Sequence, residues 1–195
     1  MTDEKFVADR FRQILANGLG LDLTDPNLKN TPERVAKMMC RELLKNIEGD
    51  FDGYTCFPND DGYSQIVMID NIHFVSMCSH HFLPFEGKAW ILYIPNKLLP
   101  GASKSARVVE FYASRPQLQE RLCHQVLNNF VEKVQPLGCM VYMRAIHQCM
   151  RCRGVKQYSG AGMSTSAIHG VFDKEAVARQ EGLDMIKMSM MGNLE

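Results

Sequence analysis

The sequence has no long hydrophobic run and no excess of charge of one sign. No apolar stretch approaches the ~20 residues that a transmembrane helix needs. The N-terminal segment MTDEKFVADRFRQ is charged where a signal peptide would be apolar. Lysine plus arginine equals aspartate plus glutamate, 22 each, so the formal net charge is zero. We therefore expect a cytoplasmic protein that binds neither membranes nor nucleic acid.

The sequence also lacks internal repeats, low-complexity segments and a paired set of cysteines. Its seven cysteines are an odd number and are scattered along the chain. In a reducing compartment such residues are free thiols by default, and only clustered ones suggest a special role. Four stand singly, and we expect them to be structural: Cys40, Cys56, Cys123 and Cys139.

What the sequence does contain is enough apolar material for a core, 46% of its 195 residues. Hydrophobic spacing and turn residues predict five helices. They cover residues 3–17, a segment beginning at Thr31-Pro32, and residues 103–114, 116–134 and 173–190. Strands are predicted at residues 64–77 (a strand pair or one long bent strand), 88–94, 138–147 and 164–172, and a loop at 49–62.

The order of these elements indicates an α+β protein with an antiparallel sheet rather than an alternating β-α fold. We expect a helical segment over residues 1–48 and a second, larger unit over residues 49–195. The methionine-rich run at residues 185–191 is interpreted as the end of an amphipathic helix that packs on a neighbour.

Two clusters of cysteine and histidine are the clearest functional signal. Cys78 and His81 are three residues apart with His80 between them, and a second cluster contains His147, Cys149 and Cys152. Ligand pairs at such short spacing are typical of zinc sites, because one turn aims both side chains at the same point. The alternative is that these residues are ordinary core cysteines and histidines, which we consider less probable for two clusters than for one residue.

The number of ligands separates two kinds of zinc site. Four ligands, Cys78, His81, Cys149 and Cys152, would make a closed structural site, whereas three would leave a position for water in a catalytic site. The spacing alone does not decide between them. The extra histidines favour catalysis, because a structural zinc has no need of acid/base groups beside it.

Several motifs together resemble the GTP cyclohydrolase I family. They are CSHHFLPF at residues 78–85, YIP at 93–95, GASKSAR at 101–107, QLQERL at 117–122, HQCM at 147–150 and RGV at 153–155, with TPERV at 31–35 in the N-terminal part. The match runs in order over residues 25–172. The resemblance implies the tunnelling fold, in which antiparallel sheets backed by helices assemble around a central barrel. It also implies a homo-oligomer, usually a decamer, with active sites at subunit interfaces.

The activity implied is hydrolysis of GTP to formate and 7,8-dihydroneopterin triphosphate, the entry to folate, other pterins and deazapurines. Zn²⁺ would be held by Cys78, His81 and Cys149, and would lower the pKa of a water molecule that attacks C8 of the guanine. His80 is the candidate acid for N7. His147 is the candidate for proton transfer as the imidazole ring opens, and histidine suits both steps at neutral pH.

The resemblance also implies residues that bind GTP. Glu120 would accept from the guanine N1–H and 2-amino groups, with Gln119 as a weaker candidate beside it. The triphosphate would meet the start of a helix and a set of cations. These phosphate candidates are Ser103, Lys104, Arg107, Arg153 and, from a neighbouring subunit, Arg34.

The sequence departs from the family at two positions. The family usually has glutamate where this chain has Ser79. A carboxylate there would favour the protonated form of the site histidines, so its loss removes no ligand but affects rate, pH optimum and metal preference. Cys152 adds a thiol near Cys149. In order of preference it is idle, forms a reversible disulfide with Cys149, or takes the open zinc position.

These departures leave other functions open. The protein could be a related enzyme that stops at the opened formamide or accepts another purine nucleotide. Glu120 and the predicted phosphate-binding residues favour GTP over these alternatives. It could also be a catalytically inactive oligomer that binds nucleotides or pterins. The retained histidines and the three retained metal ligands argue against this function. A zinc-ribbon module for nucleic acid is disfavoured by the zero net charge.

Overall fold

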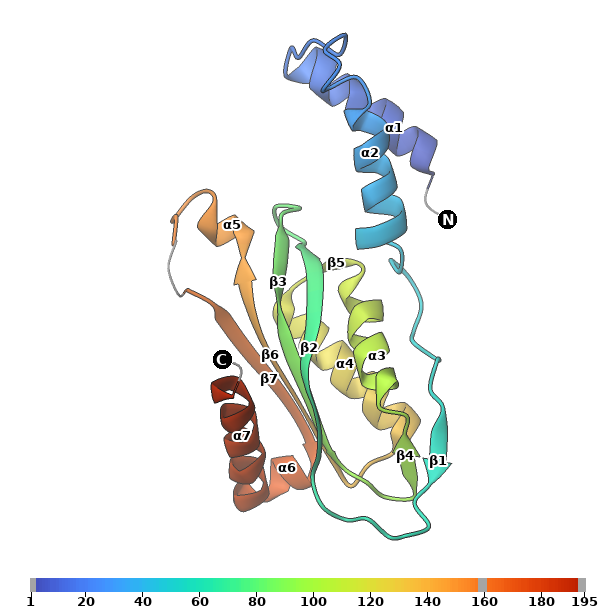
Figure 1. The fold of residues 1–195 in the computed structure, drawn as a ribbon, viewed down its shortest axis with the longest axis vertical. Helices are drawn as coiled ribbons and strands as arrows, with labels where there is room; N and C mark the ends of the chain where they lie inside the picture. The colour runs from blue at the N-terminus through green and yellow to red at the C-terminus, as the bar shows by residue number, and fades with distance from the viewer. Residues whose placement is uncertain (1–2, 158–160, 193–195) are drawn as a thin grey trace.

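The computed structural model describes residues 3–157 and 161–192 of the protein. A pair of helices at the N-terminus is followed by a curled five-stranded sheet that carries helices on both faces (Figure 1). The expected α+β class is confirmed, and the curled sheet agrees with the tunnelling fold that the resemblance implies. Within the described residues, no helix combines the length and the apolar character that crossing a membrane requires.

The N-terminal helices begin where the sequence predicts. Helix α1 (Glu4–Gln13) starts after Asp3, whose carboxylate accepts a hydrogen bond from the Phe6 amide at 2.9 Å. It runs into a wider turn, η1 (Ile14–Gly18), and so ends one residue beyond the predicted residue 17. Helix α2 (Thr31–Met38) starts at the predicted Thr-Pro pair and continues as η2 (Met39–Leu43).

The helical pair projects beyond the end of the sheet (Figure 1). It is tied to the rest of the protein by an ion pair between Lys45 and Glu110 at 2.6 Å. The amide of Asn46 also donates to the carbonyl of Ser114 at 3.1 Å. The expected division of the chain at residue 48 stays a prediction.

The main sheet has the strand order β5-β2-β3-β6-β7, and every pair except β5 with β2 is antiparallel. The five strands are β2 (Val67–Cys78), β3 (Pro84–Ile94), β5 (Pro116–Gln117), β6 (Gly138–His147) and β7 (Met163–Gly170). The segment predicted at residues 64–77 is one bent strand rather than a strand pair. Its bend lies at a bulge between Ile69 and Ile72, where Asn71 has a φ of 51°.

Four predicted boundaries are wrong, three of them because of strand pairing. Residues 116–117 pair with the end of β2 instead of opening a helix, so α4 (Gln119–Val134) starts later. Strand β3 begins four residues before the predicted position because it pairs with β2 up to Pro84. Strand β7 ends at Gly170, and α6 (Val171–Lys174) precedes α7 (Ala176–Met191). The predicted loop at 49–62 contains β1 (Cys56–Pro58), which pairs with β4 (Leu98–Pro100).

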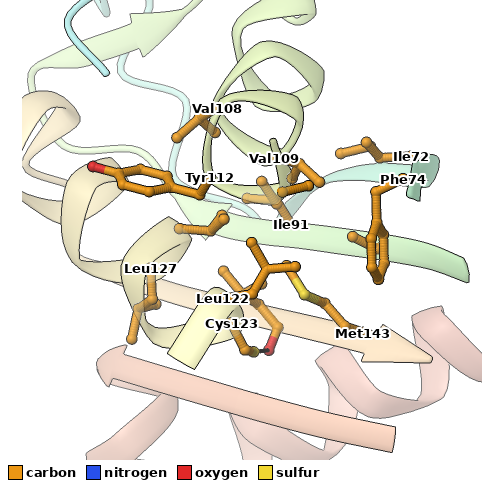
Figure 2. Close-up of a cluster of buried hydrophobic side chains, with 14 of the residues drawn as sticks. Ile72, Phe74, Ile91, Val108, Val109, Tyr112, Leu122, Cys123, Leu127 and Met143 are labelled. Atoms are coloured by element: carbon orange, nitrogen blue, oxygen red, sulfur yellow. Dashed lines mark hydrogen bonds between the residues drawn. The ribbon is translucent and has the colours of Figure 1, made fainter. Parts of the chain in front are cut away.

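The larger core lies between the sheet and two helices, α4 and α3 (Ser103–Ala113). Figure 2 shows side chains of both helices meeting Ile91 and Met143 of the sheet. Leu122, Val126 and Phe130 of α4 are fully buried, because residues four positions apart share one face of a helix.

A second core lies on the opposite face of the sheet, under α6 and α7 (Figure 1). Alternate residues of β3 supply the two cores: Ile91 packs toward α3 and α4, whereas Trp90 and Leu92 pack toward α7. Met185 and Met190 pack on this second core, so part of the methionine-rich run contacts its own chain. This arrangement buries both faces of the central strands and holds their ends in fixed positions.

Candidate metal centre

The ends of three strands bring the two cysteine-histidine clusters together. Cys78 is the last residue of β2, His81 lies in the turn to β3, and Cys149 lies in α5 (Gln148–Arg151), directly after β6. The turn is closed by two hydrogen bonds of 2.9 Å, from the Cys78 amide to the Leu83 carbonyl and from the Phe82 amide to the Cys78 carbonyl. Because β3 pairs with both β2 and β6, the two clusters meet at one end of the sheet (Figure 1).

The ligand atoms of Cys78, His81 and Cys149 all lie within 4.8 Å of one another. Tetrahedral zinc holds sulfur at ~2.3 Å and nitrogen at ~2.0 Å, so its ligand atoms are separated by roughly 3.5 Å. Cys78 is buried, Cys149 is half-buried and His81 is exposed, which leaves one side of the group open. The three residues therefore fit a zinc ion with an accessible coordination position.

The electrostatics of the two thiols also fit a cation. Burial raises the pKa of Cys149, and the hydrogen bond and charge of the neighbouring Cys78 raise it further. The positive charge of Arg153, a predicted phosphate-binding residue four positions along the chain, acts in the opposite direction. A divalent cation between the two sulfurs would remove their mutual repulsion and stabilise both thiolates.

Cys152 is not part of this three-residue group in the described chain. Its side chain is exposed, and its thiol donates to the carbonyl of Gln148 at 3.0 Å. Of the two kinds of zinc site that the sequence left open, the geometry therefore favours the three-ligand one.

His147 lies beside the metal group in a fixed orientation. It is the last residue of β6, opposite Phe85 of β3, and its ring stacks on the Phe85 ring at 4.5 Å with 3° between the planes. Its Nε2 lies 2.9 Å from Oε1 of Gln119, the first residue of α4. Burial lowers the pKa of His147, and the nearby charge of Glu120 partly opposes this shift.

The first turn of α4 also contacts the turn that bears His80 and His81. Arg121 donates to the Ser79 hydroxyl at 3.2 Å, and the Ser79 amide donates to the Gln117 carbonyl at 2.9 Å. His80 is exposed in this turn, with its ring centroid 6.1 Å from that of His81. Phe85 and Arg121 lie within the sequence motifs, but nothing in their spacing predicts a role for them, because only strand pairing and helix placement bring them to the site.

The predicted phosphate-binding residues do not all lie at this end of the sheet. Ser103, Lys104 and Arg107 are on the first turns of α3, next to β4, whereas the last residues of α3 lie near β5 and the metal group (Figure 1). The 11 residues of α3 span roughly 16 Å at ~1.5 Å per residue. Measured along α3, Ser103 and Lys104 therefore lie about a helix length from the end nearest this chain's metal group, and Arg107 lies about half that distance from it. Arg34 lies exposed on α2, in the projecting helical pair.

Fold and site together define an α+β protein with an open, candidate Cys-His-Cys metal-binding group beside a half-buried histidine. These are the groups that a metal-assisted hydrolase uses. A family profile described as GTP cyclohydrolase I matches residues 7–187. The chain belongs to the GTP cyclohydrolase I family and is an enzyme of this type.

Individual relatives agree with this assignment. The chain is similar to a GTP cyclohydrolase 1 of Carboxydothermus hydrogenoformans, with 40% identity over 95% of this chain and 96% of the relative. It is equally similar, at 40%, to a GTP cyclohydrolase 1 of Haemophilus ducreyi over 86% of this chain and 77% of the relative. Among solved structures, an archaeosine synthase QueF-Like protein in the apo form aligns with a TM-score of 0.44 and 17% identity. That alignment covers 54% of this chain and 93% of the other.

Proposed function

We propose that this enzyme uses zinc to hydrolyse GTP at C8 of the guanine, releasing formate and forming 7,8-dihydroneopterin triphosphate. The product would enter the synthesis of folate, other pterins or deazapurines. The observation that carries this proposal is the convergence of Cys78, His81 and Cys149 beside His147. We propose a cytoplasmic location, because a reducing compartment keeps the two cysteine ligands as thiols.

Cys78, His81 and Cys149 would hold the zinc ion. When bound, zinc lowers the pKa of a coordinated water molecule toward neutrality and so supplies the nucleophile for C8. The buried Cys78 fixes one side of the site, and the exposed His81 leaves room for substrate on the other.

His80 and His147 would move protons. C8 becomes a good electrophile only when N7 is protonated, and His80, in the exposed turn beside His81, is proposed as that acid. His147 is proposed to transfer a proton as the C–N bonds break and formate leaves. Its stacking on Phe85 and its bond to Gln119 support this role, because a proton carrier must be held in position.

Glu120 would recognise the guanine. It is exposed on the first turn of α4, and its charge acts on His147. A carboxylate accepts from both N1–H and the 2-amino group, a pair of donors that adenine lacks. Gln119, the weaker candidate beside it, is 1% exposed, and this burial disfavours it as a second guanine contact.

The triphosphate would bind residues of more than one subunit. The charge of Arg153 acts on Cys149 of its own chain, whereas Ser103, Lys104 and Arg107 lie in the half of α3 away from this group. A homo-oligomer, in our proposal a decamer, would place the start of one subunit's α3 against the metal group of its neighbour. Arg34 of the projecting helical pair would reach the same interface.

Incubating the zinc-loaded protein with GTP tests the proposal. Formate together with a pterin that fluoresces after oxidation is the expected result. Formate without pterin would show that the enzyme carries out only part of the reaction. The presence of Ser79, where the family usually has glutamate, is the specific reason to test for this outcome. Neither product, with GTP still bound, would make the protein a nucleotide-binding oligomer.

A further inference from the structure

The environment of His147 determines which of its ring nitrogens carries a hydrogen. The ring has its face against Phe85 and directs Nε2 at Oε1 of Gln119. Ring stacking and one hydrogen bond leave the imidazole no free rotation. The chemical state of Nε2 therefore depends on what Gln119 presents to it.

The amide of Gln119 has only one orientation that satisfies its surroundings. Its nitrogen lies 3.2 Å from the Met143 carbonyl, 3.1 Å from the Met163 carbonyl and 3.1 Å from the Thr165 hydroxyl. Carbonyl oxygens only accept hydrogen bonds, so the amide nitrogen must face them. The side chain is 1% exposed, and a buried amide turned the other way would set its oxygen against two carbonyls.

An oxygen of Gln119 thus faces His147 and can only accept. We infer that Gln119 is a positioning residue that fixes neutral His147 as the Nε2–H tautomer, so that Nδ1 is the atom through which His147 exchanges protons during the reaction. The reaction itself rests on the function proposed above, but the tautomer does not.

The same geometry removes Gln119 from substrate recognition. Both ends of its amide are occupied within the protein, by His147 on one side and by β6 and β7 on the other. A contact with guanine would break these bonds in a site with almost no exposure. Of the two adjacent residues Gln119 and Glu120, only the exposed Glu120 is then free to recognise the guanine N1–H and 2-amino group.

Neutron diffraction from deuterated crystals of the zinc-loaded protein reads the tautomer directly. We expect deuterium on His147 Nε2 and amide deuterons of Gln119 directed at the Met143 and Met163 carbonyls. A bare Nε2 facing the amide nitrogen would overturn the inference. This measurement needs no substrate, so it stands even if the protein releases no formate from GTP.

Kinetics of Gln119→Leu test the positioning role. We expect kcat for formate release to fall about tenfold to hundredfold, because a general acid–base group is misplaced, with little change in KM for GTP. A rise in KM at constant kcat would instead assign Gln119 to substrate binding. The matched control is Asn129→Leu, which removes another buried amide of α4, one that donates to the Phe51 carbonyl far from the site. It should lose stability but keep kcat.

Discussion

At the scale of single residues, two cysteines three positions apart have different chemistry. Cys149 is half-buried with its sulfur within 4.8 Å of the Cys78 sulfur, whereas Cys152 is exposed and its thiol donates to a backbone carbonyl. The helical turn between them points one thiol into the metal group and the other away from it. This difference indicates that Cys152 has no role in metal binding and is not a fourth ligand.

The two cysteines should therefore respond differently to the same substitution. Cys152→Ser should leave bound zinc near one ion per chain and keep formate release within about twofold, whereas Cys149→Ser should lose most of both. Zinc measured by atomic absorption after dialysis, next to the rate of formate release, gives the comparison. Loss of zinc from the Cys152 variant would show that this thiol is a ligand.

At the scale of elements, the close approach of β3 and β6 determines where His147 lies. Gly87 of β3 pairs with Ala145 of β6, and a Cβ at Gly87 would lie 2.0 Å from the Arg144 carbonyl oxygen and 2.6 Å from the Ala145 Cα. Both neighbours are backbone atoms and cannot turn away. The two strands carry Phe85 and His147 at their ends, so their spacing sets the stacked pair.

Gly87→Ala should consequently force the strands apart. We expect a loss of about 3 kcal/mol in the free energy of unfolding, at the upper end of the usual range for overpacking, because a clash with backbone is not relieved by a rotamer change. Urea denaturation at one protein concentration measures it. Gly18→Ala is the control, since no atom lies within 4 Å of its added Cβ, and it should be neutral or slightly stabilising. Equal midpoints for the two variants would contradict the expectation.

Buried thiols of β6 and α4 should make the fold sensitive to alkali. Burial raises the pKa of Cys139 strongly and that of Cys123 to about 12. In the unfolded chain a thiol ionises above pH ~8.5, so the unfolded state releases protons that the folded state keeps. The free energy of unfolding should therefore fall above pH ~8.5, by up to ~1.4 kcal/mol per pH unit for each thiol, until the folded pKa is reached.

Denaturation at pH 7.5, 9 and 10 checks this slope. Cys139→Ala removes one of the two thiols and should show a shallower loss between pH 9 and 10 than the natural protein. An identical slope in both proteins would mean that other groups cause the alkaline loss.

At the scale of the whole molecule, one chain holds the metal group and the first turns of α3 about a helix length apart (Figure 1). The projecting helical pair also exposes apolar side chains, including Phe6, Ile14 and Leu19, each more than half exposed. Both features are expected of a subunit that is completed by copies of itself.

Mixed oligomers test whether the site is shared. Lys104→Ala and His147→Ala should each lose most activity alone. Subunits of the two variants, refolded together in equal amounts, should regain about a quarter of the natural rate, because random pairing restores one interface site in about four. No recovery in oligomers shown to be mixed would mean that Lys104 and His147 serve the same subunit's site.

Much of this protein could be predicted from the sequence because the signals are local. The apolar spacing of α1 and α4 and the Thr-Pro pair that begins α2 placed these helices within a few positions. The short Cys78–His81 spacing indicated a metal site, and the ordered motifs indicated the family. The strand boundaries were less accurate, because β3 extends to Pro84 and residues 116–117 leave the helix only through pairing with β2.

The sequence by itself determined the α+β class, the family and the three residues that form the metal group. Only the tertiary structure decided that Cys152 lies apart, that Ser103, Lys104 and Arg107 lie in the half of α3 away from their own chain's metal group, and that Gln119 serves His147. The physical reason is that identity and spacing fix which chemistry a residue offers. Strand pairing and burial fix which atoms meet, and these depend on partners far away in the chain.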